Sequence, residues 1–259
     1  MIVLLVVIAI YSGSIGDFSA AIGFMFEPDF SKLSVNGVMI ALGHSFFTLG
    51  LASGVVIMYG AYLPRETSIV QTSLWIAVID TFVALLAGLA IFPLVFGYGL
   101  TPSEGPGLIF TTLPLAFSEM PAGGFVGTVF FIMLVIAAFT SAIAMIESSV
   151  AFVAEKFSLS RWPATIVSAG VLWLLGQLTI HSFAGSEWAQ LSGEWFGKPI
   201  NSLFDIIDVL TSSLLLPLGG LLLAVLAGWV MRSEFTKDEL DTKKGIFDVW
   251  LLCVKYISP

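Results

Sequence analysis

Long apolar runs separated by polar linkers make up most of this chain. A helix needs about 20 mostly apolar residues to cross a bilayer, so runs of that length predict spanning helices. The runs that reach it are residues 37–62, 69–96, 124–154, 163–180 and 203–231. Shorter apolar runs at 1–11 and 246–259 predict the end of one helix and the start of another. The pattern predicts an all-α integral membrane protein, with residues 1–259 forming a single membrane domain.

The linkers between these runs differ in length and charge. Residues 12–36, 101–123 and 182–201 are the long linkers, and 101–123 contains an apolar stretch that predicts a short helix in an extracellular loop. Basic residues concentrate in the short linkers, at Arg65, Lys156, Arg161, Arg232, Lys237, Lys243 and Lys244. Lys32 and Lys198 lie in long linkers, and Lys255 lies in the last apolar run. Because cytoplasmic loops carry the excess of Lys and Arg, the short linkers are predicted to be cytoplasmic.

Composition excludes several classes of protein. The chain is 58% hydrophobic and 11% charged, whereas soluble domains carry about 25% charged residues. A formal net charge of −8 without a basic patch argues against nucleic-acid binding. One cysteine and two distant histidines indicate neither a disulfide framework nor a metal centre. The sequence also contains no pattern of a nucleophile with a nearby base that would indicate an enzyme. Residues 1–11 lack the positively charged leading region of a signal peptide, which argues against that interpretation.

The run at residues 37–62 is interrupted near its midpoint. Gly50 and Gly54, with Thr48 and Ser53 beside them, fall within residues 46–54, where a continuous helix would cross the bilayer centre. Unwound backbone is tolerated at that depth only inside protein or along a cavity, and secondary transporters bind substrates and ions at broken helices. This favours a transport site at the interruption. The same spacing of glycines also suits small-residue packing between helices, so both interpretations stay open.

Hydroxyl groups in residues 124–154 form a second candidate. A helix places Ala137, Thr140 and Ser141 on one face, where their oxygens are suitable ligands for Na⁺. Hydroxyls in membrane helices also commonly bond to their own backbone, which is the alternative interpretation.

Acidic residues inside the spans are a third candidate. Asp80 lies within residues 69–96, and an acid inside a membrane helix usually faces a cavity or a partner. Glu147 is placed similarly, and a residue on a helix outside this chain is one candidate partner. Asp205 and Asp208 lie near the outer end of their span, where a solvated carboxylate costs little.

Ordered motifs run along the whole chain, and together they are more specific than any one of them. They are Phe46-Phe47-Thr48-Leu49-Gly50-Leu51, Tyr59-Gly60-Ala61-Tyr62, Ala90-Ile91-Phe92-Pro93, Gly107-Leu108-Ile109-Phe110 with Thr112-Leu113-Pro114, Phe139-Thr140-Ser141-Ala142-Ile143-Ala144, Phe204-Asp205-Ile206-Ile207-Asp208 and Tyr256-Ile257-Ser258-Pro259. In these motifs the chain resembles the bacterial branch of the neurotransmitter:sodium symporter family, which has the leucine-transporter fold.

The resemblance implies a partial transporter. The chain would correspond to the end of the family's fifth helix through the start of its eleventh, and would hold the second of two inverted repeats. The family's first helix, which supplies much of the ion and substrate site, would be missing, so we expect a truncated portion located in the bacterial cytoplasmic membrane. The expected partners are membrane lipid, an amino acid as the small-molecule substrate, and the missing N-terminal half on a separate chain.

The resemblance also assigns site residues. The implied substrate-binding residues are Phe47, Thr48, Gly50, Ser53, Ser141 and Met145, with Phe47 in an outer lid. The implied ligands are Thr48 and Asp80 for a first sodium ion, and the Ala137 carbonyl with the Thr140 and Ser141 hydroxyls for a second. The implied gate residues are Asp208 on the outside and Glu155 and Tyr62 on the inside.

Departures from the family pattern refine these expectations. Asp80 stands where members often have Asn, and Ala84 where chloride-dependent members have Ser, so we hypothesise that Asp80 balances the sodium charge and chloride is not required. Gly50 and Ser53 replace larger residues, which favours a bulky hydrophobic or aromatic substrate. His44 replaces a commoner Gln, and a buried, hydrogen-bonded histidine is favoured over a proton sensor.

The implied function is sodium-coupled symport of an amino acid or related small amine by alternating access. One alternative is a non-transporting fragment or an assembly partner of a membrane protein. Another is a channel or membrane-enzyme subunit, which predicts a row of pore-lining polar residues or cofactor-ligating histidines.

Overall fold

The computed structural model describes residues 2–64, 66–102, 105–195, 198–240 and 244–258. Arg65, Lys243 and Pro259, which entered the charge and motif patterns, lie outside these residues, and only the backbone of Lys32, Lys198 and Lys244 is described. The chain divides into two compact units. The first is Met1–Lys32 with Ile76–Ala142, and the second is Leu33–Trp75 with Ile143–Pro259.

Four helical segments within the described residues are long and apolar enough to cross a membrane. They are α5 (Ile69–Gly97), α7 (Gly123–Lys156), α8 (Arg161–Phe183) and the run Leu203–Val230. Their bounds lie close to the apolar runs expected at 69–96, 124–154, 163–180 and 203–231. In each, no more than 11% of the most hydropathic window is buried inside the structure, so lipid or further helices must cover the remaining apolar surface.

The run Leu203–Val230 is not a uniform α-helix. It contains α9 (Leu203–Asp208), the π-helical segment η4 (Val209–Leu215), α10 (Leu216–Val225) and a second π-helical segment, η5 (Leu226–Val230). The Leu216 N–H bonds to the carbonyl of Thr211, five residues earlier. Pro217 has no N–H to continue the α-helical ladder, which explains a wide turn at this point. Helix α11 (Ser233–Leu240), α12 (Lys244–Leu252) and η6 (Cys253–Ile257) follow.

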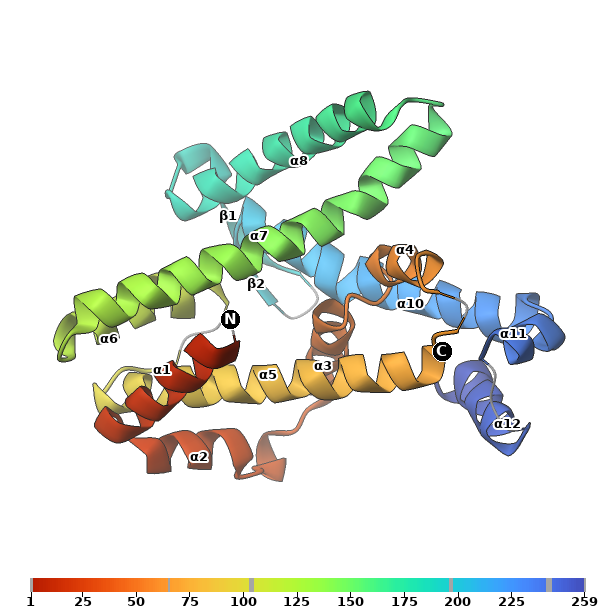
Figure 1. Cartoon of the computed structure of the whole chain (residues 1–259). Helices are drawn as coiled ribbons and strands as arrows, with labels where there is room; N and C mark the ends of the chain where they lie inside the picture. Colours follow the sequence, from red (N-terminus) through yellow and green to blue (C-terminus); the bar gives the residue numbers. More distant parts are fainter. Residues whose placement is uncertain (1, 65, 103–104, 196–197, 241–243, 259) are drawn as a thin grey trace. The chain divides into compact units, whose positions relative to one another are not determined.

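In the first unit, α1 (Ile2–Ile15) and α2 (Phe18–Phe26) are bent by 116° with respect to each other. Asp17 lies at the bend, and its carboxylate accepts a hydrogen bond from the Ala20 N–H at 2.9 Å, which caps α2. The bent pair lies beside α5 (Figure 1). A short segment, η1 (Phe30–Lys32), ends this part of the unit.

Close backbone contacts join α1 to the end of α5. The Asp17 N–H donates to the carbonyl of Pro93 at 2.9 Å, and a side chain at Gly97 would meet the Cα atom of Gly16 at 2.7 Å. Only glycine permits such an approach. The buried apolar core of this unit includes Leu5, Ile8, Leu94, Leu113, Phe117 and Phe130.

The long linker at residues 101–123 forms part of that core. It contains η2 (Leu108–Thr112) and α6 (Leu113–Glu119), where the sequence predicted one short helix. Phe117 of α6 contacts Phe130 of α7 with 5.6 Å between ring centroids. The Tyr11 hydroxyl donates to the Pro121 carbonyl at 2.8 Å, which ties α1 to the end of the linker.

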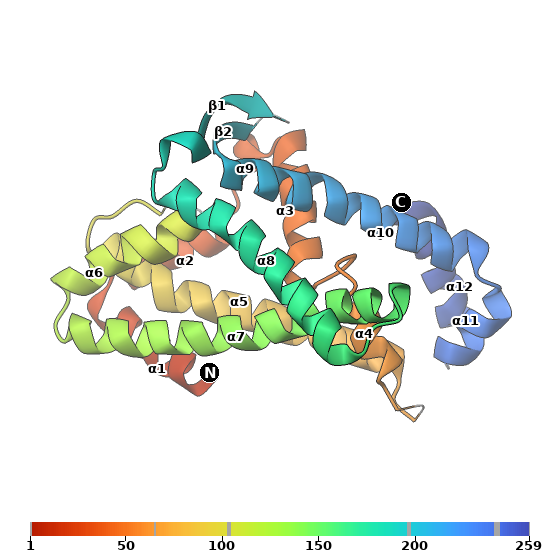
Figure 2. The ribbon, with the colours of Figure 1, turned by 90° about the horizontal axis from the view of Figure 1, so that it is seen from above.

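In the second unit, residues 187–202 form a segment η3 (Glu187–Ala189) and an antiparallel hairpin of β1 (Gln190–Trp195) and β2 (Lys198–Ser202). The hairpin lies near the end of α8 and the start of α9 (Figure 2). Ser182 anchors it: its carbonyl accepts from the Gln190 side chain at 2.8 Å, and its hydroxyl accepts from the Phe204 N–H at 3.0 Å. The sequence pattern predicted only a linker here.

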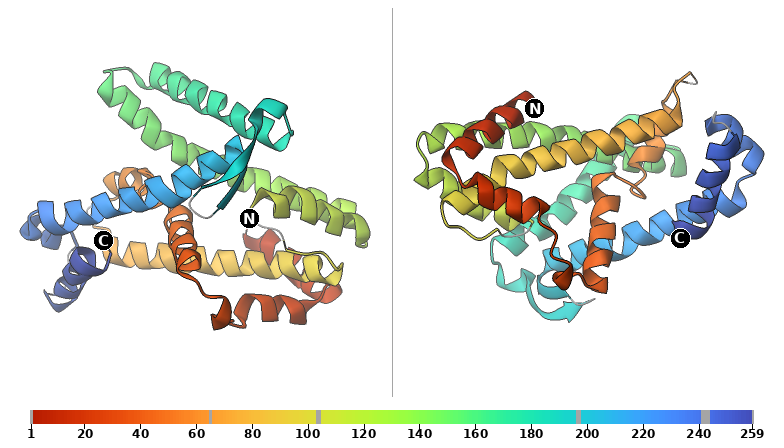
Figure 3. Two further views of the ribbon diagram at one scale, coloured as in Figure 1. Left: turned by 180° about the vertical axis from the view of Figure 1, so that it is seen from behind. Right: turned by 90° about the horizontal axis from the view of Figure 1, so that it is seen from below.

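The expected span at residues 37–62 consists of two helices, α3 (Val35–Thr48) and α4 (Val55–Ala61). Helix α3, in orange, meets the blue segment of η4 and α10 in both views of Figure 3. Gly43 is buried at this crossing, and a side chain there would lie 2.8 Å from the Ser212 carbonyl. The crossing therefore brings two helix backbones into direct contact.

Candidate functional site

Helix α3 ends in a Schellman motif at the predicted interruption. The Leu51 N–H donates to the Phe46 carbonyl at 2.9 Å, and the Gly50 N–H donates to the Phe47 carbonyl at 3.1 Å. Gly50 has φ of 63°, a left-handed conformation that glycine adopts without a steric penalty. The sequence Phe-Phe-Thr-Leu-Gly-Leu therefore stops the helix by a local, identifiable mechanism.

The second half of the break leads the chain into α4. Ala52 and Gly54 have φ of 64° and 82°, so Ala52 holds a conformation that costs about 1–2 kcal/mol for a residue with a Cβ. The Ser53 hydroxyl donates to the Gly50 carbonyl at 2.7 Å. The helix is therefore broken here, and a Cβ atom at Gly54 would also lie 3.3 Å from the Ser148 Cβ atom, so close packing accompanies the break.

The residues assigned to substrate lie on or next to this break, except for two on α7. The Phe47 side chain is 59% exposed, and Thr48 is also exposed. Gly50 and Ser53 belong to the break itself and are half-buried. Met145 lies on the part of α7 in the second unit, and Ser141 on the part in the first unit, and both are exposed.

The structure brings two assigned sodium ligands together on one turn of α7. The Thr140 hydroxyl donates to the Ala137 carbonyl at 2.9 Å and lies 3.2 Å from the Ile136 carbonyl. This is the backbone bond that the sequence left open as an alternative. A hydroxyl that donates its proton keeps its lone pairs, so the bond orients the Thr140 oxygen without removing it as a ligand. Ser141 is exposed beside it.

The other assigned residues lie at different places in the two units. Asp80 is half-buried on α5 in the first unit. In the second unit, Asp208 is exposed at the end of α9, Glu155 is exposed near the end of α7, and Tyr62 is 63% exposed just after α4.

His44 does not have the buried position expected from the sequence. Its side chain is exposed on α3. The neighbouring Gly43 occupies the buried side of the helix at the crossing with η4, and consecutive helical residues point in different directions. The expectation of a buried histidine is wrong for this reason.

Glu147 has a partner within the chain, where the sequence indicated a residue on a helix outside it. The Arg161 guanidinium donates to both Glu147 carboxylate oxygens at 2.7 Å. The Tyr62 hydroxyl lies 3.4 Å from one of them. Arg161 opens α8, and the short linker folds it back toward α7. An acid late in one span followed by an arginine at the start of the next was the signal available in the sequence.

Asp205 has a structural explanation. Its carboxylate accepts from the Asn201 N–H at 2.8 Å and from the Ser202 hydroxyl at 3.1 Å. Ser202 in turn caps α9 by accepting from the Asp205 N–H, which is a reciprocal capping arrangement. Asp205 therefore fixes the start of α9.

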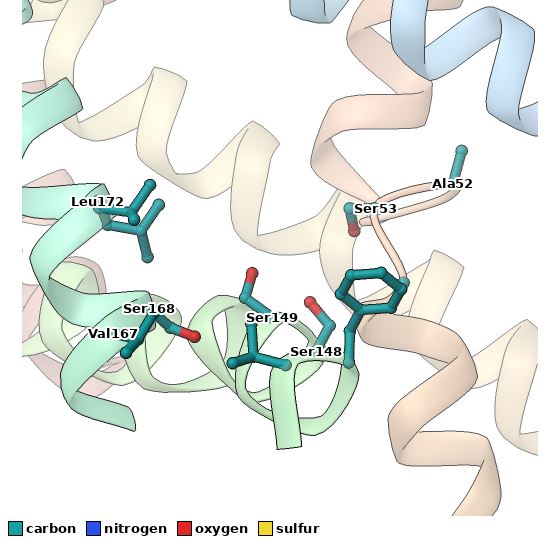
Figure 4. A pocket seen from close by; sticks show the side chains of 11 residues that line it. Ala52, Ser53, Ser148, Ser149, Val167, Ser168 and Leu172 are labelled. Carbon is teal, nitrogen blue, oxygen red and sulfur yellow. The ribbon is translucent and has the colours of Figure 1, made fainter. Parts of the chain in front are cut away.

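A groove of about 520 Å³ in the second unit lies between residues 52–54, α7 and α8. Serine hydroxyls from all three segments face it, among apolar side chains (Figure 4). Ser168 is 5% exposed and its hydroxyl has no hydrogen-bond partner. A buried hydroxyl without a partner costs free energy. A group that covers the groove and forms a hydrogen bond with the Ser168 hydroxyl would remove this cost.

Comparison with known proteins decides the family. The model of the sodium:neurotransmitter symporter family matches residues 1–207. The chain belongs to the sodium:neurotransmitter symporter family. The resemblance drawn from the motifs is thereby confirmed, and the family is one of membrane symporters rather than enzymes.

Relatives of this chain include transporters and a solved structure. An uncharacterized sodium-dependent transporter of Haemophilus influenzae is 35% identical over 240 residues, covering 92% of this chain and 51% of the relative. Another from Bacillus subtilis, YhdH, is 31% identical over 263 residues, covering 100% of this chain and 57% of the relative. The crystal structure of MhsT in complex with L-phenylalanine is similar with a TM-score of 0.87 and 37% identity, covering 99% of this chain and 57% of that one.

These similarities confirm the fold prediction. The chain is a multi-pass membrane protein with part of the leucine-transporter fold, including a broken helix at residues 49–54. The chain spans about half the length of the curated relatives it matches.

Proposed function

We propose that this chain contributes to sodium-coupled symport of an amino acid by alternating access. The observation that supports this most is the helix broken at Leu49 to Gly54 in a member of a sodium symporter family. Breaks of this kind present backbone carbonyls and helix ends to ions and solutes. In this proposal, the N-terminal half of the fold completes the transporter.

In this proposal, sodium binds at the Ala137–Thr140 turn of α7. The Ala137 carbonyl, the Thr140 hydroxyl and the Ser141 hydroxyl are hard oxygen donors of the kind that Na⁺ prefers. The Thr140 hydroxyl oxygen lies 2.9 Å from the Ala137 carbonyl oxygen, close enough for one ion to contact both. Thr48 and Asp80 serve the first sodium ion.

The proposed substrate is a bulky hydrophobic amino acid such as phenylalanine. Gly50 has no side chain and Ser53 has a small one, which leaves space beside the break. By the resemblance to the family, Phe47, Ser141 and Met145 are the other residues that we propose contact the substrate, with Phe47 in the outer lid. The relative MhsT was crystallised with L-phenylalanine. Asp208 acts at the outer gate, and Glu155 and Tyr62 act at the inner gate.

Thr140→Val tests the sodium assignment, because valine keeps the shape and removes the hydroxyl. We expect the sodium concentration needed for half-maximal L-phenylalanine binding to rise roughly tenfold, as when one ligand interaction of a bound metal is lost. Thr128→Val is the matched control, since the Thr128 hydroxyl also donates to the carbonyl four residues earlier in α7, at 2.7 Å. Equal sodium dependence in the two variants would contradict the assignment.

We further propose that chloride is not required, because the Asp80 carboxylate balances the charge of sodium. Replacing chloride by gluconate should leave sodium-dependent binding unchanged. Asp80→Asn should either abolish binding or make it depend on chloride. Loss of binding in gluconate with Asp80 intact is the contrary result.

An assembly partner of another membrane protein is the second candidate function. The groove with the unpartnered Ser168 hydroxyl supports it, because another transmembrane helix could cover the groove and bond to that hydroxyl. Sodium-dependent amino-acid binding by this chain would argue against a role limited to assembly.

A further inference from the structure

We propose that two adjacent glycines of α10, Gly219 and Gly220, are positioning residues that set the geometry of the break. The proposal rests on the proposed function for its consequence in transport, but the contacts lie entirely within the second unit. The glycines contact Phe46, before the point where α3 ends, and Ala52, after it. We refer to Gly219 and Gly220 as the glycine pair.

Gly220 supports the end of α3. A Cβ atom at this position would collide with the ring of Phe46, and it would lie 2.9 Å from the ring atom Cζ. The Phe46 ring therefore rests directly on the α10 backbone. Phe46 also accepts the hydrogen bond from Leu51 that ends the helix, so the contact fixes the residue on which the Schellman motif depends.

Gly219 supports the far side of the same break. A Cβ atom there would lie 2.8 Å from the Cβ atom of Ala52. Ala52 has φ of 64°, a strained conformation for a residue with a side chain, which persists only when its surroundings hold it. The α10 backbone is one of those surroundings.

The contacts continue along the same face toward the outer end. Gly43 of α3 contacts the Ser212 carbonyl in η4, and Asp208 lies one turn before Ser212, whose hydroxyl donates to the Asp208 carbonyl. A displacement of α10 is therefore passed to Phe46 and Ala52 by direct steric contact. The glycine pair makes the position of Phe47 and Thr48, the next residues along the chain, depend on the helix that carries the proposed outer gate.

Hydrogen exchange of the full chain in nanodiscs tests this without substrate. In Gly220→Ala, we expect the amides of Gly50 and Leu51 to exchange about tenfold faster, because an extra methyl group in a tight contact displaces its neighbours. Gly176→Ala is the control, since a Cβ atom at Gly176 on α8 meets nothing within 4 Å. Equal exchange in these two variants would overturn the proposal.

Compensating changes separate positioning from general loss of folding. Phe46→Leu should restore slow exchange in Gly220→Ala by replacing the ring with a smaller side chain, and Ala52→Gly should do the same in Gly219→Ala. If Gly220→Ala does not fold, its recovery by Phe46→Leu supports the proposal. If neither Gly220→Ala nor its combination with Phe46→Leu folds, the test passes to Gly219→Ala with and without Ala52→Gly. If Ala52→Gly does not restore slow exchange in Gly219→Ala, the proposal is overturned.

Transport gives an independent readout. In a transporter completed with an N-terminal half, Gly220→Ala should raise the KM for L-phenylalanine about tenfold because the break is misplaced. Gly176→Ala should leave this KM unchanged. If the wild-type transporter shows no sodium-dependent uptake, the proposed function fails and the exchange result alone judges the glycine pair. An unchanged KM in a transporter that does work would overturn the link to substrate binding.

Discussion

At the scale of single residues, Gly50 ends α3 because it adopts φ of 63° at the position where a Schellman motif needs a left-handed residue. We predict that Gly50→Ala lowers the free energy of unfolding by about 1 kcal/mol, from the strain of a Cβ in that conformation. Gly60→Ala in α4 is the control: its Cβ would meet nothing within 4 Å, and alanine favours the helix by about 0.5–1 kcal/mol. Reversible unfolding in mixed detergent micelles measures both. Equal effects of the two substitutions would show that Gly50 has no special role.

Ser168 and Ser182 both lie on α8, but only the Ser182 hydroxyl has hydrogen-bond partners. The Ser182 hydroxyl accepts from the Phe204 N–H and donates to the Leu178 carbonyl, whereas the Ser168 hydroxyl has no partner. Ser182→Ala should therefore cost about 1–2 kcal/mol of unfolding free energy. Ser168→Ala should be neutral or stabilising by up to about 1 kcal/mol. A larger loss for Ser168→Ala than for Ser182→Ala in the same assay would contradict the assignment of these bonds.

Residue types and spacing predicted which side chains to consider, but not all of their partners. Gly50 and Gly54 indicated the break because left-handed backbone is a local property of the chain. An acid late in one span and an arginine at the start of the next indicated a pair of Glu147 with Arg161, but their direct contact depends on how α8 folds back toward α7. His44 was misjudged because its burial depends on which side of α3 meets η4.

At the scale of elements, α1 is held to α5 by close backbone contact in addition to the apolar core that they share. A Cβ atom at Gly97 would lie 2.7 Å from the Gly16 Cα and 2.9 Å from the Asp17 nitrogen, and backbone atoms cannot move aside easily. We predict that Gly97→Ala costs about 1–3 kcal/mol of unfolding free energy. Gly124→Ala, where a Cβ meets nothing within 4 Å, should not destabilise the protein. A neutral Gly97→Ala would show that α1 does not need this contact.

The ion pair between α7 and α8 offers a test by charge exchange. Reversing either charge alone, by Glu147→Arg or Arg161→Glu, should lower the Tm because like charges then face each other at the present 2.7 Å contact. Combining both reversals should recover most of the loss. The effect should weaken at high salt, since Arg161 is 67% exposed and screening acts on exposed charges. A double variant no better than the single ones would contradict a direct pair.

Four of the five apolar runs coincide within a few residues with helical segments long enough to span, because the bilayer itself fixes that length. The run at residues 37–62 instead consists of two shorter helices. Apolar run length did not predict the hairpin of β1 and β2, whose residues are too polar and too few to give a distinct pattern. Nor did it predict η4, where the wide turn depends on Pro217 and on the crossing with α3 rather than on hydrophobic spacing.

At the scale of the whole molecule, the chain exposes apolar helix surface that must be covered. The share of each hydropathic window buried inside the structure is at most 11%, and the chain spans about half the length of its curated relatives. Membership of the symporter family gives these surfaces a context, since lipid and a complementary half would both contact them. The amino-acid pattern revealed the membrane class and the family, but the identity of the covering helices depends on sequence outside these residues.

We propose above all that the break at residues 49–54 belongs to a sodium-coupled transport site. Sodium-driven uptake of radiolabelled L-phenylalanine tests this most directly. The measurement uses proteoliposomes containing this chain together with the N-terminal half of the Bacillus subtilis relative. The account predicts uptake under an inward sodium gradient, its loss when potassium replaces sodium, and a roughly tenfold reduction by Thr140→Val. Uptake that is equal in sodium and potassium, or absent in both, would contradict it.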